Sequence, residues 1–181
     1  ILMAWVLTIP PSAALAYDPS MSPSGSYLAG RSAAKLRDND LASDYLTNAL
    51  KSDEGNPILS VKVFLLALAD GNIPKAAAPA KQVLTFNSQQ RMARIVLGIK
   101  DFRARQYGDA RKNFEQSAYT PVGELTSWLL TAWAFAGEGD LDNAMKALDR
   151  LDSNESFSNF KTFHAALITD YLGNAMRAEG A

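Results

Sequence analysis

Apolar residues recur at helical spacing along nearly the whole chain, from about Ser26 onward. They fall into segments of roughly 12–15 residues, and no segment alternates apolar and polar residues as a half-buried strand does. Short polar stretches separate the segments, at 37–40, 70–72, 105–106, 137–140 and 173–174. The pattern therefore predicts an all-α fold of short helices joined by tight turns.

The segments repeat with a period of 34 residues. One column of small residues keeps this spacing without an insertion: Ala42, Ala76, Ala110, Ala144 and Ala178. A second column lies four residues later: Leu46, Ala80, Phe114 and Leu148. A third column, five residues before the alanines, contains Gly71, Gly139 and Gly173, and glycine favours the left-handed backbone of a tight turn.

A helix pair of this length cannot bury both apolar faces alone, so each pair must stack on the next. Small side chains are needed where two helices cross closely, and bulky ones fill the space between neighbours. The alanine column and the column that contains Leu46, Phe114 and Leu148 meet these two needs. The sequence therefore predicts an α-solenoid.

The pattern resembles the tetratricopeptide repeat family, whose 34-residue unit has a small residue at position 8 and Ala at position 20. Gly30, Gly98 and Ala132 match position 8, whereas Phe64 departs from it and predicts looser packing in the second unit. Trp128 matches an aromatic position, and residues 139–144 (GDLDNA) are similar to the family's turn sequence. In two turns the glycine is replaced, by Arg37 and Arg105. The resemblance implies helix-turn-helix units that form a right-handed superhelix.

The chain divides into an export-signal-like segment (1–16), a linker (17–25) and a repeat domain (26–181). The register places the repeat units at 23–56, 57–90, 91–124, 125–158 and 159–181. The fifth unit is cut off a few residues into its second helix, so we expect the native protein to continue.

Residues 1–16 carry no charge and combine an apolar run with small residues at Ala14 and Ala16, as in a secretory signal. A buried helix is the alternative. The chain starts at Ile1 without a charged segment, so we expect the true start upstream. A signal followed by such repeats resembles exported bacterial repeat proteins, which predicts a periplasmic location.

Charge is balanced, with 18 basic and 19 acidic residues and no block of one sign. We therefore expect no nucleic-acid binding. The chain has no Cys, which excludes disulfides and thiolate chemistry within it. The same balance of charge leaves no basic block for anionic lipid, and we expect no membrane insertion of the mature domain.

Candidate catalytic and metal-binding residues are few. His164 is the only histidine, and we interpret it as a packing or groove-lining residue. Asp38 and Asp40 lack the Gly and the distal Glu of a calcium loop and are interpreted as part of a helix cap. We expect no catalytic site, no metal and no cofactor, and hence a protein that is not an enzyme.

In tetratricopeptide arrays the first helix of each unit lines a concave groove, and the resemblance implies the groove positions here. They are Tyr27, Arg31, Leu65, Ile95, Ile99, Phe102, Arg103, Leu129, Trp133, Phe163 and Leu167. This groove would be apolar with a few basic residues at its rim and would fit a protein or peptide partner with apolar anchors. Alternatively, Ile99, Leu129 and Trp133 belong to the core between repeats.

The leading functional hypothesis is a protein-protein interaction scaffold of the bacterial cell envelope. One alternative is a regulatory or spacer region of a longer enzyme whose catalytic domain follows Ala181. The other is a repeat protein that self-assembles through its terminal repeat.

Overall fold

The computed structural model describes residues 18–179, with side chains up to Gly173. The predicted export segment (1–16) lies outside these residues. Within the described part every regular element is a helix, and no strand is present. The helices are α1 (Pro23–Lys35), α2 (Asn39–Leu50), α3 (Pro57–Ala69), α4 (Ile73–Phe86), α5 (Arg91–Arg103), α6 (Tyr107–Glu115), α7 (Pro121–Gly137), α8 (Leu141–Asp149) and α9 (Ser158–Glu179). Two short 3₁₀ turns, η1 (Arg150–Ser153) and η2 (Glu155–Phe157), join α8 to α9.

Polar side chains fix where most of the helices begin. At Asp38, Asn56, Asn72, Thr120 and Asp140 the side-chain oxygen accepts a hydrogen bond from the backbone N–H three residues later, at 2.9–3.1 Å. Each bond satisfies one of the N–H groups that have no partner inside the helix.

The first helix begins earlier than the sequence predicts. Ser22 caps α1 and Pro23 occupies its first turn, where a missing N–H costs nothing. The helix therefore includes the last three residues of the predicted linker, 17–25.

The turns within the helix pairs have one backbone geometry at 34-residue spacing. Arg37, Gly71, Arg105 and Gly139 have φ values of 61°, 76°, 59° and 81°. This left-handed conformation ends a helix and satisfies its last carbonyl groups. The two arginines that replace the turn glycine thus adopt the glycine conformation, although it is less favourable for a residue with a Cβ atom.

The turn predicted at Gly173 is absent, because α9 runs without a break from Ser158 to Glu179. A turn is stabilised when the following helix packs back on the preceding one. The few residues that follow Gly173 in this sequence offer little apolar surface for such packing.

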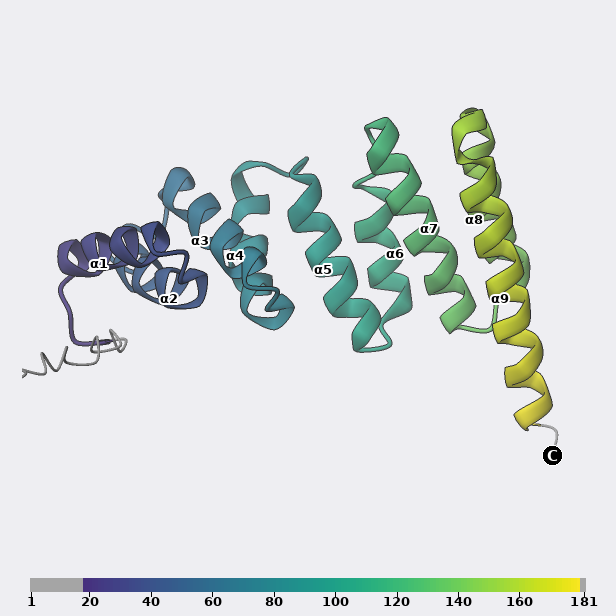
Figure 1. Ribbon diagram of the computed structural model, residues 1–181, viewed down its shortest axis with the longest axis horizontal. Helices are drawn as coiled ribbons and strands as arrows, with labels where there is room; N and C mark the ends of the chain where they lie inside the picture. The colour runs from purple at the N-terminus through teal and green to yellow at the C-terminus, as the bar shows by residue number, and fades with distance from the viewer. Residues whose placement is uncertain (1–17, 180–181) are drawn as a thin grey trace, which may run out of the picture.

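The helices stack in chain order and form an elongated molecule (Figure 1). Each helix contacts the next, and in addition α5 contacts α7 and α7 contacts α9. In Figure 1, α7 lies in front of α6 and α9 lies in front of α8. Odd-numbered and even-numbered helices thus form two layers, which confirms the predicted all-α solenoid of helical repeats.

Two ion pairs link α2 and α4 in the even-numbered layer. The ammonium group of Lys75 on α4 binds the carboxylates of Asp40 and Asp44 on α2. Burial on its own lowers the pKa of Lys75, but the hydrogen bonds to Asp40 and Asp44 outweigh it, so the pKa is raised.

The first four alanines of the predicted column lie in the core, whereas the side chain of Ala178 lies outside the described residues. Ala42, Ala76, Ala110 and Ala144 are each fully buried. The bulky residues Leu46, Phe114 and Leu148 of the second column are buried as well. The close helix crossings therefore occur at the positions that the 34-residue period identifies.

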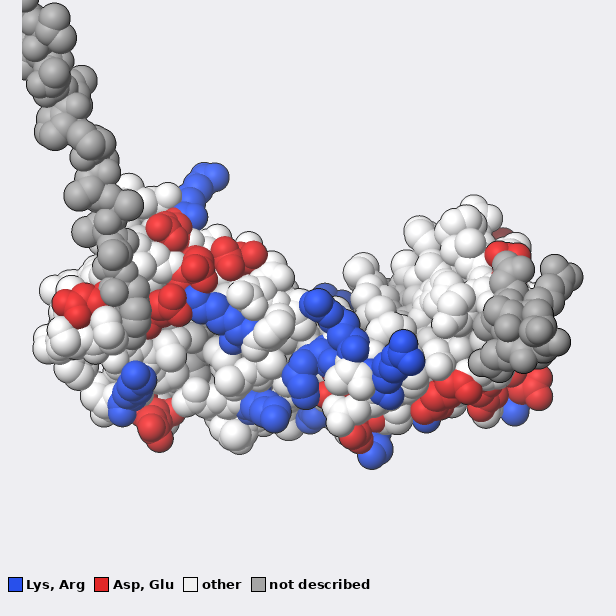
Figure 2. All heavy atoms as spheres, turned by 90° about the horizontal axis from the view of Figure 1, so that it is seen from below, with Lys and Arg blue, Asp and Glu red and all other residues white. Residues whose placement is uncertain are grey.

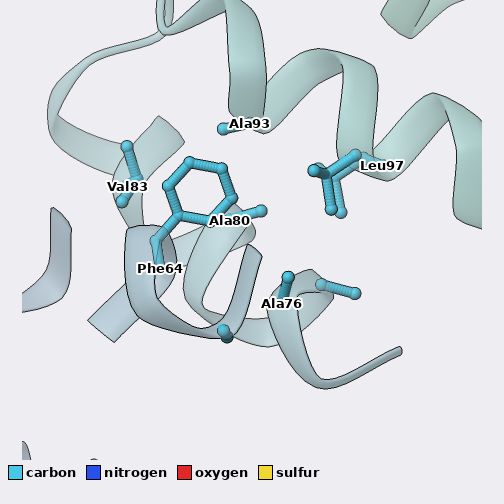
Figure 3. Close-up of a cluster of buried hydrophobic side chains, with 9 residues drawn as sticks. Phe64, Ala76, Ala80, Val83, Ala93 and Leu97 are labelled. Atoms are coloured by element: carbon cyan, nitrogen blue, oxygen red, sulfur yellow. The ribbon is translucent and has the colours of Figure 1, made fainter. Parts of the chain in front are cut away.

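The prediction of looser packing around Phe64 is wrong. Phe64 is fully buried and packs against the small residues Ala76 and Ala80 (Figure 3). In the first and third units the sizes are reversed, because Gly30 lies against Leu46 and Gly98 lies against Phe114. The second unit exchanges the large and the small residue between its two helices and still fills the space.

Candidate functional site

The candidate site is the face of the odd-numbered helices. In Figure 2 the outline of the molecule is hollowed along one long side, between its N-terminal half and α9. That side faces the reader in Figure 1, where α7 and α9 are in front. Acidic and basic side chains are interspersed over the surface seen in Figure 2.

At the N-terminal end the predicted groove residues are exposed. Tyr27 on α1 is 40% exposed, and the guanidinium carbon of Arg31 lies 5.8 Å from the centre of its ring. This distance allows a cation–π contact that orients the charge beside the ring. Leu65 on α3 is also exposed.

In the middle of the molecule the predicted residues belong partly to the core. Ile99 and Phe102 on α5 pack against the buried Phe114, and Ile95 is half-buried. The ring of Phe102 meets the ring of Tyr107 edge to face, with 5.3 Å between the centres. Arg103, at the end of α5, is exposed.

Leu129 and Trp133 on α7 are half-buried and pack against the cluster that contains Leu148 and Ile168. Much of the surface of Ile99, Leu129 and Trp133 is therefore packed between repeats, as the alternative interpretation expects. A partner could reach only the part of each side chain that remains exposed.

His164 on α9 contacts α7. Its Nδ1 atom accepts a hydrogen bond from the indole Nε1–H of Trp133 at 2.9 Å. Because an indole nitrogen can only donate, Nδ1 must be unprotonated and the ring proton lies on Nε2. The imidazole ring also lies edge to face with Phe163. His164 thus packs between two helices, which fits the structural role expected from the sequence.

An ion pair also holds α9 in place. Lys161 Nζ lies 2.8 Å from a carboxylate oxygen of Asp149 and 2.7 Å from one of Asp152. The hydrogen bond to Asp149, followed by that to Asp152, raises the pKa of Lys161. These contacts join the first turns of α9 to the end of α8 and to η1.

That free face is a stripe of apolar side chains, the α9 stripe: Phe160, Phe163, Leu167 and Tyr171. They are 49%, 61%, 40% and 50% exposed. Their spacing of three and four residues places them along one side of the helix. The sequence identified Phe163 and Leu167, but it missed Phe160, which lies one turn earlier on the same side.

Metal and membrane sites receive no support from the described residues. No group of three or more His, Cys, Asp or Glu side chains in that part of the chain could hold a metal ion. Among the helices described, none is long and apolar enough to cross a bilayer.

Comparison with known proteins gives a likeness of fold. No family model matches the chain, and no curated protein sequence matches it. Solved structures of similar fold include two of MamA. A crystal structure of MamA protein has a TM-score of 0.66 and 16% sequence identity, over 83% of this chain and 82% of MamA. MamA from Desulfovibrio magneticus RS-1, from residue 41 to its end, has a TM-score of 0.57 and 14% identity, over 87% of this chain and 94% of that one.

Proposed function

We propose that this chain is a protein-interaction scaffold of the tetratricopeptide type that binds an apolar segment of a partner protein on the face of its odd-numbered helices. Membership of that family is supported by the 34-residue register and by the solenoid that this register forms. The chain acts by binding and not by catalysis.

One observation carries the proposal: large apolar side chains are exposed at groove positions toward both ends of the solenoid, on α1, α3 and α9. Tyr27, Leu65, Phe163 and Leu167 are each at least 40% exposed. Leaving apolar surface in water costs about 25 cal/mol per Å² relative to burial. Large apolar side chains exposed on one face of a folded protein are typical of an interaction surface.

The chemistry of this face defines the partner. Aromatic and aliphatic anchors favour a helix or an extended segment that carries apolar side chains. Arg31 and Arg103 are exposed at the edge of the face and would bind carboxylates on the same segment.

The test uses residues whose replacement leaves the core intact. Peptides selected from a random 12-residue display library would be titrated into the protein and their affinity measured by calorimetry. Phe163→Ser combined with Leu167→Ser should weaken binding by at least about tenfold, because removal of two apolar anchors costs about 2–4 kcal/mol. Phe102 and Trp133 are poorer choices, since both also pack in the core.

Leu36→Ser is the matched control, because Leu36 follows α1 and is 71% exposed outside the predicted groove. This variant should bind as the parent does. Equal affinity of the Phe163/Leu167 variant and the parent, or selection of no peptide at all, would contradict the proposal.

Self-assembly is a second candidate, favoured by the α9 stripe at the end of the described solenoid. Sedimentation velocity at increasing concentration would detect it. We expect Phe160→Ser to shift any dimer toward monomer, and a purely monomeric parent would exclude this function.

We further propose that the scaffold works in a cell envelope, on the basis of the signal-like residues 1–16. Residues 1–25, preceded by a Met and a short lysine-containing segment in place of the expected upstream start, would be fused to a reporter that is active only outside the cytoplasm and should give activity. Leu7→Arg, which interrupts the apolar run, should abolish it. Equal reporter activity with and without residues 1–25 would count against export.

A further inference from the structure

A set of clefts recurs on the opposite side of the solenoid, where neighbouring even-numbered helices lie side by side. One cleft is lined by residues of α2 and α4, the next by α4, α5 and α6, and the third by α6, α7 and α8. Thr47, Lys81 and Glu115 line the three clefts in turn at one position of the 34-residue register. The clefts therefore recur with the repeat, and the side chains of each unit determine whether its cleft is basic, acidic or neutral.

The middle cleft, called here the α4–α6 cleft, has a volume of about 420 Å³ and a buried charge in its wall. Asp101 on α5 is only 7% exposed. Lys100 Nζ lies 2.6 Å from its Oδ1, and Asn113 Nδ2 donates to its Oδ2 at 3.2 Å. The same register position holds Ala67 in α3 and Phe135 in α7. The other two units show that this position can be filled by an apolar residue. A buried carboxylate needs partners to be tolerated, so packing alone does not explain why Asp101 is charged.

Asp101 and Asn113 position an arginine at this cleft. While Asn113 donates to Asp101, its Oδ1 atom accepts from Arg94 Nη1 at 3.4 Å. The Nε–H of Arg94 donates to the carbonyl oxygen of Ser88 at 3.2 Å. Both acceptors of Arg94 are neutral, so its positive charge is not balanced by them. Since a guanidinium has five N–H donors, some remain for a ligand.

The cleft carries a surplus of positive charge. It is lined by four cationic residues and two carboxylates, which is an excess of two positive charges. Lys100 pairs with Asp101, and Lys112 pairs with Asp109. In the described part of the chain no salt bridge joins Lys81 or Arg94 to a carboxylate. These two residues are the surplus cations.

This site is separate from the groove. Arg94, Leu97 and Asp101 follow one another at helical spacing along the cleft side of α5. Arg103 belongs to the predicted groove on the other side of the same helix. Two ligands could therefore bind α5 from opposite sides.

We propose that the α4–α6 cleft is a second binding site that takes the side-chain carboxylates of an acidic peptide segment. The planar guanidinium of Arg94 matches a carboxylate through two parallel hydrogen bonds, and Lys81 supplies a second charge. The proposal does not depend on the groove, and it gives the scaffold two faces with different preferences: apolar on one side and acidic on the other.

Titration of the ¹⁵N-labelled protein with a hexaglutamate peptide at pH 7 tests this site. The side-chain NH₂ signals of Asn113 serve as the reporter, because this amide lies between Arg94 and Asp101. Hexaglutamate should shift these signals, and uncharged hexaglutamine should not. Arg94→Gln should weaken hexaglutamate binding by at least about tenfold, the effect of one charge-assisted hydrogen bond.

Arg37→Gln is the matched control, because Arg37 is an exposed arginine in the turn after α1 and belongs to neither the groove nor the cleft. It should leave hexaglutamate binding unchanged. Phe163→Ser with Leu167→Ser should also leave it unchanged, which separates this site from the proposed groove. If Arg94→Gln lowers the melting temperature, its loss of binding could come from a damaged fold. Lys81→Gln then tests the site, since Lys81 is exposed and without an ion pair in the described residues.

Two results would overturn the proposal. The first is full hexaglutamate affinity in both the Arg94→Gln and Lys81→Gln variants. The second comes from a parallel titration with inorganic phosphate: if phosphate shifts the Asn113 signals in an Arg94-dependent way and hexaglutamate does not, the cleft is a phosphate site. Retention of part of the affinity in Arg94→Lys would support the proposal, because lysine keeps the charge but loses the planar fork.

Discussion

At the scale of single residues, one contact in each helix pair determines how closely its two helices pack. A Cβ atom added to Gly98 would lie 2.3 Å from a ring carbon of Phe114, and one added to Gly30 would lie 2.7 Å from Leu46. Neither neighbour can retreat, because both are fully buried. In the second unit Phe64 provides the bulk and Ala80 the space.

This exchange predicts strong coupling between Phe64 and Ala80. Phe64→Ala should destabilise the fold by about 3–5 kcal/mol through the cavity it leaves. Ala80→Leu should cost about 1–3 kcal/mol through overpacking. The double variant recreates the arrangement of Ala132 and Leu148, so its free energy of unfolding should exceed the additive expectation by at least about 1 kcal/mol. Urea denaturation of the four proteins measures this.

Phe64→Ala combined with Leu148→Ala is the control, since these residues lie in different core clusters. Their effects should add. Additive effects for Phe64 and Ala80 as well would show that the two residues do not share one space.

The sequence predicted the alanine column correctly because close crossings accept only small side chains. It did not predict the packing of Phe64, because a column of residues on one helix does not show which residue of the facing helix each member contacts. Phe64 departs from one column and Ala80 from another, and only their contact in three dimensions shows that the two departures compensate.

At the scale of elements, caps and turns decide where helices begin and end. The carboxylate of Asp140 accepts hydrogen bonds from the backbone N–H and the side-chain amide of Asn143, at 3.0 and 2.6 Å. The backbone hydrogen bond, followed by the side-chain one, lowers the pKa of Asp140 from its ordinary value of 3.8. The folded state thus favours the charged carboxylate that caps α8.

The stabilisation from Asp140 should therefore depend on pH. Since folding lowers its pKa, the contribution is fully present above about pH 4 and is lost as the pH falls through the lower, folded-state pKa. Thermal melts of the parent and Asp140→Ala between pH 7 and pH 2 should show a gap that closes at the acid end. A constant gap at every pH would contradict this role.

The sequence identified the turns at Gly71 and Gly139, but it wrongly added one at Gly173. Local residues favour a turn without enforcing it. Asn72 and Asp140 each cap a following helix that packs back on its partner. After Gly173 the helix simply continues, because a turn without a packed second helix brings no tertiary contacts.

At the scale of the whole molecule, stability is a sum over neighbours. Within the described chain α1 and α9 have helices on one side only, whereas α5 contacts α4, α6 and α7. A stack of this kind opens most easily at its ends.

Hydrogen exchange should show that the terminal helices open more often than the central ones. We expect the amides of α4–α6 to exchange at least about tenfold more slowly than those of α1 and α9. Exchange followed by mass spectrometry measures it helix by helix. Equal protection along the chain would instead indicate a single cooperative unit.

The register predicted the fold more completely than the candidate site. Leu129 and Phe163 share one position of the repeat, yet Leu129 is half-buried against a cluster that includes residues of α9, whereas Phe163 is 61% exposed. Exposure depends on which helix comes next, and a column of residues does not contain that information. The α4–α6 cleft was missed for a related reason, since Arg94, Asp101 and Asn113 are individually ordinary and become a site only when α5 and α6 pack.

The exchanged sizes of Phe64 and Ala80 also bear on how such a chain can change over evolutionary time. Repeat arrays lengthen and shorten by recombination between similar copies. A crossover within a helix pair that joins the second unit to another would place Phe64 opposite a second bulky residue, or a small residue such as Gly98 opposite Ala80. A crossover within the pair between the other units still joins one small and one large residue, so the second unit alone must be gained or lost as a whole.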